Sequence, residues 1–163
     1  MSILIMKKTL RPYQIDLAIK GAEMINRLKL CYVASEVRTG KTATSLEIAR
    51  LTESKKVLFL TKKKAISSIL SDYSDFGYSF ELVVINNESM HTIECNDFDL
   101  IVSDEHHRNG AFPKPNKFTK DIKKRFSRIP MVFLSGTPTP ENHAQWFHQF
   151  WVSKNSPFKE YVN

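Results

Sequence analysis

SEVRTGKT, at residues 35–42, is the segment that decides the fold of this chain. It follows a strand-like apolar run at 30–34 and opens a helix-like run that ends near Arg50. A strand, a Gly-Lys-Thr loop and a helix in this order are typical of a phosphate-binding P-loop. In such a loop, backbone N–H groups and the helix dipole favour the negative charge of a phosphate. The segment therefore predicts a nucleoside triphosphate site, with Lys41 at the β- and γ-phosphates and Thr42 on Mg²⁺.

Ser35 stands where the full P-loop pattern has its first glycine. A small side chain can still turn there, but we expect a loop that is strained or differently shaped. A Gly-Lys-Thr triplet on its own also occurs by chance in a basic protein. The flanking strand and helix, and an acidic motif downstream, favour the nucleotide site over that alternative.

Asp104 and Glu105 form a second candidate site, directly after an apolar run at 98–103 that is typical of a buried strand. An acidic pair at the carboxyl end of a parallel strand lies where α/β sheets bind ligands. Asp104 would complete the Mg²⁺ shell, and Glu105 would polarise the attacking water. A solvated acidic turn is the alternative, and the P-loop about sixty residues upstream favours the catalytic pair.

The segment LSGTPTP, at residues 134–140, ends another apolar strand expected at 131–134. Glycine and two prolines predict a tight loop there, with the hydroxyls of Ser135 and Thr137 at its tip. Taken alone this is an ordinary turn. In register with the other two sites it would be a relay between a nucleotide and a polymer.

The segment LRPYQ, at residues 10–14, precedes an amphipathic helix, and Pro12 suits its first turn. The amide of Gln14 carries both a donor and an acceptor, which together can pair with an adenine. On the sequence alone, an ordinary solvent-facing glutamine is the simpler interpretation of this residue.

In this order, the four motifs resemble the first RecA-like domain of a superfamily 2 helicase, with most likeness to the Swi/Snf-like branch of the DEAH/DExH type. The motifs that carry the resemblance are LRPYQ at 10–14, TGKT at 39–42, DEHH at 104–107 and LSGTP at 134–138. The resemblance covers nearly the whole chain. One departure is His106, which replaces the common alanine of the family and is expected to change only local packing.

The resemblance implies ATP and Mg²⁺ as cofactors, and it assigns roles to individual residues. Gln14 would recognise adenine, Asp104 would be the metal carboxylate, and Glu105 would be the catalytic base. The loop with Ser135 and Thr137 would couple hydrolysis to movement on nucleic acid. Nucleotide binding is expected at Arg11, Gln14, Arg38, Thr39, Gly40, Lys41 and Thr42, metal binding at Thr42 and Asp104, catalysis at Glu105, Asp104 and Lys41, and nucleic-acid binding at Lys62, Lys63, Ser135 and Thr137.

Strand and helix patterns alternate along the chain, which predicts an α/β fold with a mostly parallel sheet and helices on both faces. Right-handed crossovers would bring Lys41, Asp104 and Ser135 to one edge of that sheet. Helices are expected at 13–28, 42–51, 65–73, 118–126 and 144–151, and strands at 30–34, 57–60, 80–85, 99–103 and 131–134.

The net charge of +7 points to a polyanionic partner, with duplex DNA favoured and RNA possible. Lys62 and Lys63 follow a strand end and are expected to contact the phosphate backbone. A second basic stretch at 114–128 fits a solvated helix face equally well. No apolar run reaches the length of a membrane span, so we expect no membrane partner and a location in the cytoplasm of a bacterial or viral host cell, or in a eukaryotic nucleus.

The 163 residues are expected to form one helicase ATP-binding, RecA-like domain that spans 1–163. Enzymes that this chain resembles carry a second RecA-like domain with an arginine finger, and we expect that domain to lie outside this chain. Hydrolysis is then expected to be weak or absent without the second domain in cis. The alternatives are a non-catalytic nucleic-acid-binding module and another P-loop phosphotransferase, such as a small kinase.

Overall fold

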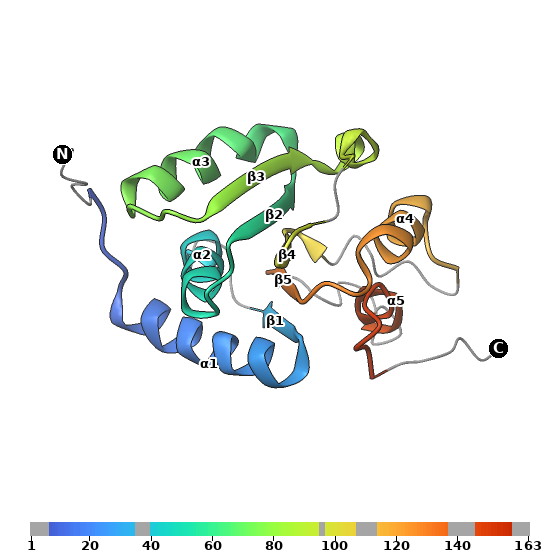
Figure 1. The fold of residues 1–163 in the computed structure, drawn as a ribbon, viewed down its shortest axis with the longest axis horizontal. Helices are drawn as coiled ribbons and strands as arrows, with labels where there is room; N and C mark the ends of the chain where they lie inside the picture. The colour runs from blue at the N-terminus through green and yellow to red at the C-terminus, as the bar shows by residue number, and fades with distance from the viewer. Residues whose placement is uncertain (1–6, 35–39, 95–96, 107–113, 137–145, 158–163) are drawn as a thin grey trace.

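The computed structural model describes residues 7–34, 40–94, 97–106, 114–136 and 146–157. It contains a five-stranded sheet, all of it parallel, between two layers of helices (Figure 1). The strands are β1 (Leu30–Ala34), β2 (Lys56–Thr61), β3 (Glu81–Asn86), β4 (Leu100–Ser103) and β5 (Met131–Ser135), in the order β1-β5-β4-β2-β3. The predicted fold class, an α/β sheet covered on both faces, is confirmed.

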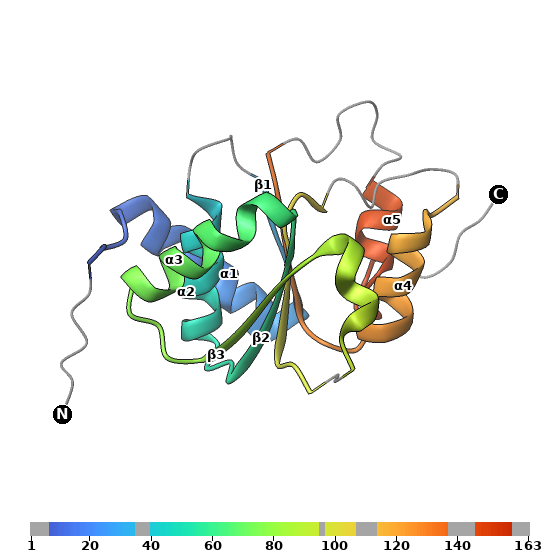
Figure 2. The same cartoon turned by 90° about the horizontal axis from the view of Figure 1, so that it is seen from above.

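The helices divide between the two faces of the sheet (Figures 1 and 2). One face carries α1 (Pro12–Leu28), α2 (Lys41–Leu51) and α3 (Ile66–Asp75), and the other carries α4 (Lys117–Phe126), α5 (Trp146–Trp151) and the 3₁₀ helix η2 (Asn87–Thr92). A short 3₁₀ turn, η1 (Lys63–Ala65), leads into α3. The predicted strands and helices are found within about two residues of their expected bounds where the structure describes them, whereas η2 was not predicted.

The three central strands β2, β4 and β5 are mostly apolar because both of their faces are buried, whereas the outer strand β3 is only half-buried. Successive side chains point to opposite faces, so each strand supplies two cores. In β2, Val57 and Phe59 pack with the residues of α1, α2 and α3, while Leu58 and Leu60 pack with those of α4 and η2. This double burial fixes the register of the strands, and with it the places where the strands end.

The strand order places three loops next to one another. β5 lies between β1 and β4, with Ala34 opposite Ser135 and Ser103 opposite Phe133. Because all strands are parallel, the segments that follow β1, β4 and β5 leave the sheet at the same edge, which is the upper edge in Figure 2. The start of α2 at Lys41, Asp104 after β4 and Ser135 at the end of β5 therefore lie at one end of the sheet.

The segment before α1 is fastened to the end of α3. The backbone N–H groups of Lys7 and Lys8 donate to the carbonyl oxygen of Asp75, at 2.8 and 3.1 Å. The side chain of Lys8 also forms ion pairs, 2.8 Å from Asp72 and 3.4 Å from Asp75. These contacts hold the segment across the gap between α1 and α3.

Among the described residues, no helix is both long and apolar enough to cross a bilayer.

Candidate nucleotide site

Gly40 starts the helix that follows the predicted P-loop. It is the N-cap of α2 and has a φ of 75°, in the left-handed region that favours glycine. A Cβ at this position would lie 2.0 Å from Nε2 of Gln14, so any other residue would also displace the Gln14 amide from its place beside Gly40. Residues 35–39, which include the predicted Arg38 and Thr39 and the unusual Ser35, lie outside the described residues.

Gln14 is buried, with 7% of its surface exposed, so the solvent-facing interpretation of this residue is wrong. Its side-chain oxygen accepts a hydrogen bond from the backbone N–H of Arg11 at 2.8 Å. Its Nε2 lies 3.5 Å from the carbonyl oxygen of Gly40, to which it donates. The amide thus joins the start of α1 to the P-loop, and each of these atoms has one further hydrogen-bonding position.

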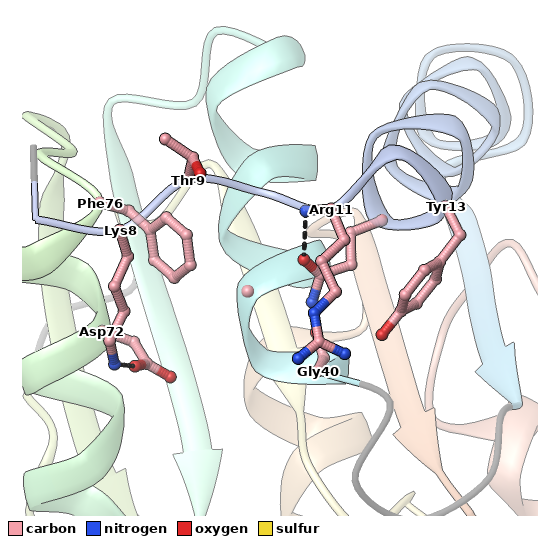
Figure 3. Close-up of a pocket in the computed structure, with 9 residues that line it drawn as sticks. Lys8, Thr9, Arg11, Tyr13, Gly40, Asp72 and Phe76 are labelled. Carbon is pink, nitrogen blue, oxygen red and sulfur yellow. Dashed lines mark hydrogen bonds and ion pairs between the residues drawn. The ribbon is translucent and has the colours of Figure 1, made fainter.

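A cavity of about 310 Å³ opens beside Gln14, a volume at the lower end of the range for small-molecule sites. Arg11 and Tyr13 reach down from the start of α1 toward Gly40, while Asp72 and Phe76 stand on the opposite wall (Figure 3). The full lining is Lys8, Thr9, Arg11, Tyr13, Gln14, Gly40, Ala43, Asp72 and Phe76.

Sequence reasoning missed part of this lining. Tyr13 lies inside the LRPYQ segment, so its place beside Gln14 was a usable signal. Asp72 and Phe76 carry no such signal, because only the packing of α3 against α2 brings them to the cavity.

Asp104 follows β4 and is held by the neighbouring strand. Its backbone N–H donates to the carbonyl oxygen of Leu60 at 2.9 Å, and its Oδ2 accepts from the hydroxyl of Thr61 at 2.8 Å. Burial raises the pKa of the Asp104 carboxyl, and the nearby negative charge of Glu105 adds to the rise. The hydrogen bond from Thr61 and the positive charge of Lys41 oppose it. Lys41 and Asp104, far apart in sequence, therefore act on one another electrostatically.

Glu105 has a φ of 53°, a left-handed conformation that is uncommon outside glycine and that occurs often at functional sites. Its Oε1 forms an ion pair with Nζ of Lys62 at 2.6 Å, and each side chain is about one-third exposed, at 32% and 33%. The predicted catalytic base and the first predicted nucleic-acid residue are therefore partners. Lys63, the second, lies exposed in η1.

Ser135 is the last residue of β5 and is only 1% exposed, so its hydroxyl does not lie at a loop tip as we expected from the sequence. Instead it hydrogen-bonds the phenol of Tyr32 on β1, and this bond opposes the rise in the pKa of Tyr32 that burial causes. In this arrangement the Ser135 side chain links β5 to β1. Thr137 lies outside the described residues.

His106 does more than fill space. It is fully buried, and its ring stacks on Phe133 with centroids 3.8 Å apart and planes 8° from parallel. Its Nε2 contacts the carbonyl oxygen of Gln149 in α5, and its Nδ1 lies 2.9 Å from Oγ of Ser103. A carbonyl only accepts, so Nε2 carries the proton and Nδ1 accepts from the serine hydroxyl. The imidazole thereby fastens α5 to the acidic motif, a contact that the sequence did not indicate.

The donor set fits Mg²⁺ better than a transition metal. Thr42 and Asp104 offer a hydroxyl and a carboxylate, and Mg²⁺ is commonly held by one or two such oxygens together with substrate phosphates. Within the part of the chain that the structure describes, no three His, Cys, Asp or Glu residues gather as a metal site. Thr42 lies one residue into α2, at the helix end that faces the sheet edge.

Replacing Asp104 with Asn is expected to stabilise the nucleotide-free protein at about pH 7. Because folding raises the pKa of this carboxyl, the folded protein binds the proton more tightly than the unfolded chain. This contribution to stability is fully present below the unfolded pKa and is lost as the pH rises through the folded pKa. Asparagine stays neutral, and its side-chain oxygen can still accept from Thr61, at the cost of the hydrogen bond that the carboxylate accepts from the backbone N–H of Glu105.

Thermal unfolding at about pH 4 and about pH 7 measures the effect, and the advantage of the variant should grow toward neutral pH. The exposed Asp16→Asn on α1 is the control, expected to change the free energy of unfolding by less than about 0.5 kcal/mol. A less stable Asp104→Asn protein at neutral pH would contradict the expectation.

A scan of the sequence against protein-family models gives no match, and a search of curated proteins gives none either. Solved structures do match. The helicase domain of Hef from Pyrococcus furiosus has a TM-score of 0.70 at 18% identity, over 93% of this chain and 37% of that chain. The UvsW helicase from bacteriophage T4 has a TM-score of 0.62 at 15% identity, over 91% of this chain and 61% of that one.

A nuclease-deletion mutant of the Type ISP restriction-modification enzyme LlaGI, solved in complex with a DNA substrate mimic, gives a TM-score of 0.61 at 16% identity. The match covers 83% of this chain and 18% of that enzyme. This chain thus corresponds to between 18% and 61% of the lengths of the three solved chains. At these identities the likeness shows a shared fold.

Proposed function

We propose that this chain, whose fold is that of helicase RecA-like domains, is the ATP-binding motor domain of a nucleic-acid-dependent ATPase. The single observation that carries the proposal is the meeting of three elements at one sheet edge. These are the start of α2 at Lys41, the half-buried carboxylate of Asp104, and Glu105 in its left-handed turn. The motif resemblance makes a superfamily 2 helicase or DNA translocase the proposed class, with the Swi/Snf-like branch as the finer assignment.

The cavity beside Gln14 would receive the adenine of ATP. The free donor and acceptor positions of the Gln14 amide suit an adenine edge, and Arg11 and Tyr13 reach into the same space. The triphosphate would then extend past Gly40 to the N-terminus of α2, where backbone N–H groups favour anions. Arg38 and Thr39 are proposed to add to this cradle.

The phosphates would be held by Lys41 and by a Mg²⁺ ion on Thr42 and Asp104. When bound, the ion would neutralise the negative charge that develops on the transferred phosphoryl group. The hydroxyl of Thr61 orients the Asp104 carboxylate. Glu105 is proposed to accept the proton of the attacking water, and release of its carboxylate from Lys62 would make it a stronger base.

Nucleic acid is the proposed activator, with duplex DNA favoured over RNA. Lys62 and Lys63 follow β2 at the same edge as Asp104, so a phosphate that draws Lys62 away would also free Glu105. Ser135 and Thr137 are proposed to couple hydrolysis to movement, Ser135 through its bond to Tyr32. Full turnover is proposed to need a second RecA-like domain in cis.

The experiment is ATP turnover with and without duplex DNA, on residues 1–163 and on the full native protein. We expect DNA-stimulated turnover, weak in the chain alone, that Lys41→Ala removes. Lys20→Ala on the exposed face of α1 is the control and should leave turnover unchanged. Turnover that survives Lys41→Ala would overturn the proposal.

A second candidate, a non-catalytic nucleic-acid-binding module, is favoured by one contact. The carboxylate of Glu105 is neutralised by Lys62 at 2.6 Å, which would suit a residue that only shapes the loop. Binding of DNA without turnover in either form of the protein would select this candidate.

A further inference from the structure

Three lysines on α4 share one solvent-facing side of the helix. Lys117, Lys120 and Lys124 are exposed, and their spacing of three and four residues puts them on the same face. We call these three residues the α4 lysine face. They belong to the basic stretch at 114–128, for which the sequence left a solvated helix face as an equal alternative.

Two other basic residues of the stretch serve the fold. Lys123 donates to the carbonyl oxygen of Trp151 at 2.8 Å, and its ammonium lies 4.4 Å from the centre of that indole. Arg125 donates to the carbonyl oxygens of Met90 and Ile93, at the end of η2. Cations near the last carbonyls of a helix satisfy free acceptors and complement its dipole. These contacts account for Lys123 and Arg125 without any external partner.

The α4 lysine face has no comparable partner. Within the described ranges, none of its three ammonium groups forms an ion pair or a hydrogen bond with a protein group. The single acidic residue of α4, Asp121, follows Lys117 by four residues and precedes Lys124 by three, so it shares this side of the helix and offsets one of the three positive charges. The exposed Lys114 and Arg128 continue the positive charge beyond both ends of the helix.

The side chains of the α4 lysine face favour one class of partner over others. The large apolar side chains exposed in the described residues lie on α1 and α3 and not on α4, so the face lacks the apolar centre of a protein interface. The same absence of exposed aromatic rings argues against single-stranded nucleic acid, whose bases need stacking platforms. Lysines act as point charges toward phosphate and do not read base sequence. A duplex backbone fits these properties.

The face also has a suitable length and position. Seven residues of α-helix rise about 10 Å, which equals about three base-pair steps of 3.4 Å measured along the axis of a DNA duplex. The chain leaves β4 at the end of the sheet that carries Asp104. Because β5 is parallel to β4, the chain enters β5 at the other end of the sheet, so α4 runs away from Asp104 toward that other end (Figure 2). Lys117 is therefore the lysine of this face nearest to the site.

We propose that the α4 lysine face binds the phosphate backbone of duplex DNA as a second contact, separate from Lys62 and Lys63. The proposal rests on the proposed function for nucleic acid as the partner, and it concerns binding alone. Such a contact would hold the duplex beside the domain while Lys62 and Lys63 bind and release it. It would add affinity without sequence preference.

The test is the affinity of the full chain for a fluorescein-labelled 20-base-pair duplex, measured by anisotropy without nucleotide from about 50 to 200 mM salt. The variant carries Lys117→Gln, Lys120→Gln and Lys124→Gln. The matched control carries Lys20→Gln, Arg27→Gln and Lys55→Gln, which remove the same charge from exposed positions on α1 and before β2. We expect the slope of log K against log salt to fall by about three in the variant, close to one per lost phosphate contact.

An equal loss in the variant and the control would overturn the proposal, because only net charge would then matter. A loss of affinity seen only with a duplex RNA probe would overturn the assignment to DNA. If neither the unchanged protein nor the variants bound a duplex, the proposal that this face binds nucleic acid would be overturned. A selective loss of slope in a protein that fails to turn over ATP would leave this inference standing while the motor function falls.

Discussion

The Glu105→Gln variant is expected to hydrolyse ATP about 10²–10⁴-fold more slowly than the unchanged protein while it still binds nucleotide. Glutamine keeps the shape of the side chain but cannot accept the proton of an attacking water. The backbone N–H of Glu105 donates to the Asp104 carboxylate at 3.0 Å and does not depend on the Glu105 side chain, so Asp104, the proposed metal ligand, should stay in place. DNA-stimulated turnover of the full native protein and nucleotide binding by the same preparation measure the two effects.

The lost ion pair with Lys62 should cost little stability, because both partners are about one-third exposed, at 33% and 32%. Glu23→Gln, on the exposed face of α1, removes the same charge far from the site edge and should leave turnover intact. Unchanged ATP turnover in Glu105→Gln would show that Glu105 is not the general base. A loss of nucleotide binding together with turnover would show that Glu105 shapes the site.

His106→Ala is expected to lower the free energy of unfolding by roughly 3–5 kcal/mol. The change removes a fully buried ring stacked on Phe133 and leaves a cavity between the sheet and α5. It also leaves the Gln149 carbonyl oxygen without its N–H donor and the Ser103 hydroxyl without its acceptor. Urea unfolding followed by tryptophan fluorescence measures the loss, since Trp151 lies at the end of α5.

The matched control is His91→Ala, where an exposed histidine contacts the Glu88 carbonyl oxygen within η2. That variant should change the free energy of unfolding by less than about 0.5 kcal/mol. A loss of similar size in both variants would mean that the buried ring of His106 contributes no more than surface packing does.

The elements of this fold could be predicted because each is specified locally. The strands are short apolar runs, the P-loop lies between a strand and a helix, and parallel strands send their following loops to one edge. Those rules sufficed to bring Lys41 and Asp104 together. The roles assigned to the site residues remain predictions.

Other parts of the site depend on contacts that no local pattern contains. The ion pair of Lys62 with Glu105 joins the segment after β2 to the segment after β4. The bond of His106 to Gln149 needs the position of α5, and the cavity wall at Phe76 needs the packing of α3. A sequence pattern indicates whether one segment is a helix or a strand and which of its faces is buried. The contacts described here depend instead on how two such elements pack together.

β1 is the outermost strand on one side of the sheet, and this position bears on the order in which the strands can pair during synthesis. β1 pairs with β5, about one hundred residues later, with Leu30 opposite Met131. β1 therefore cannot join the sheet until β5 has left the ribosome, whereas β2, β3 and β4 can pair with one another earlier. Closing so long a loop is entropically costly, and non-local parallel pairing is slow. The start of α2, which follows β1, thus takes its place beside the sheet only after β5 has been synthesised.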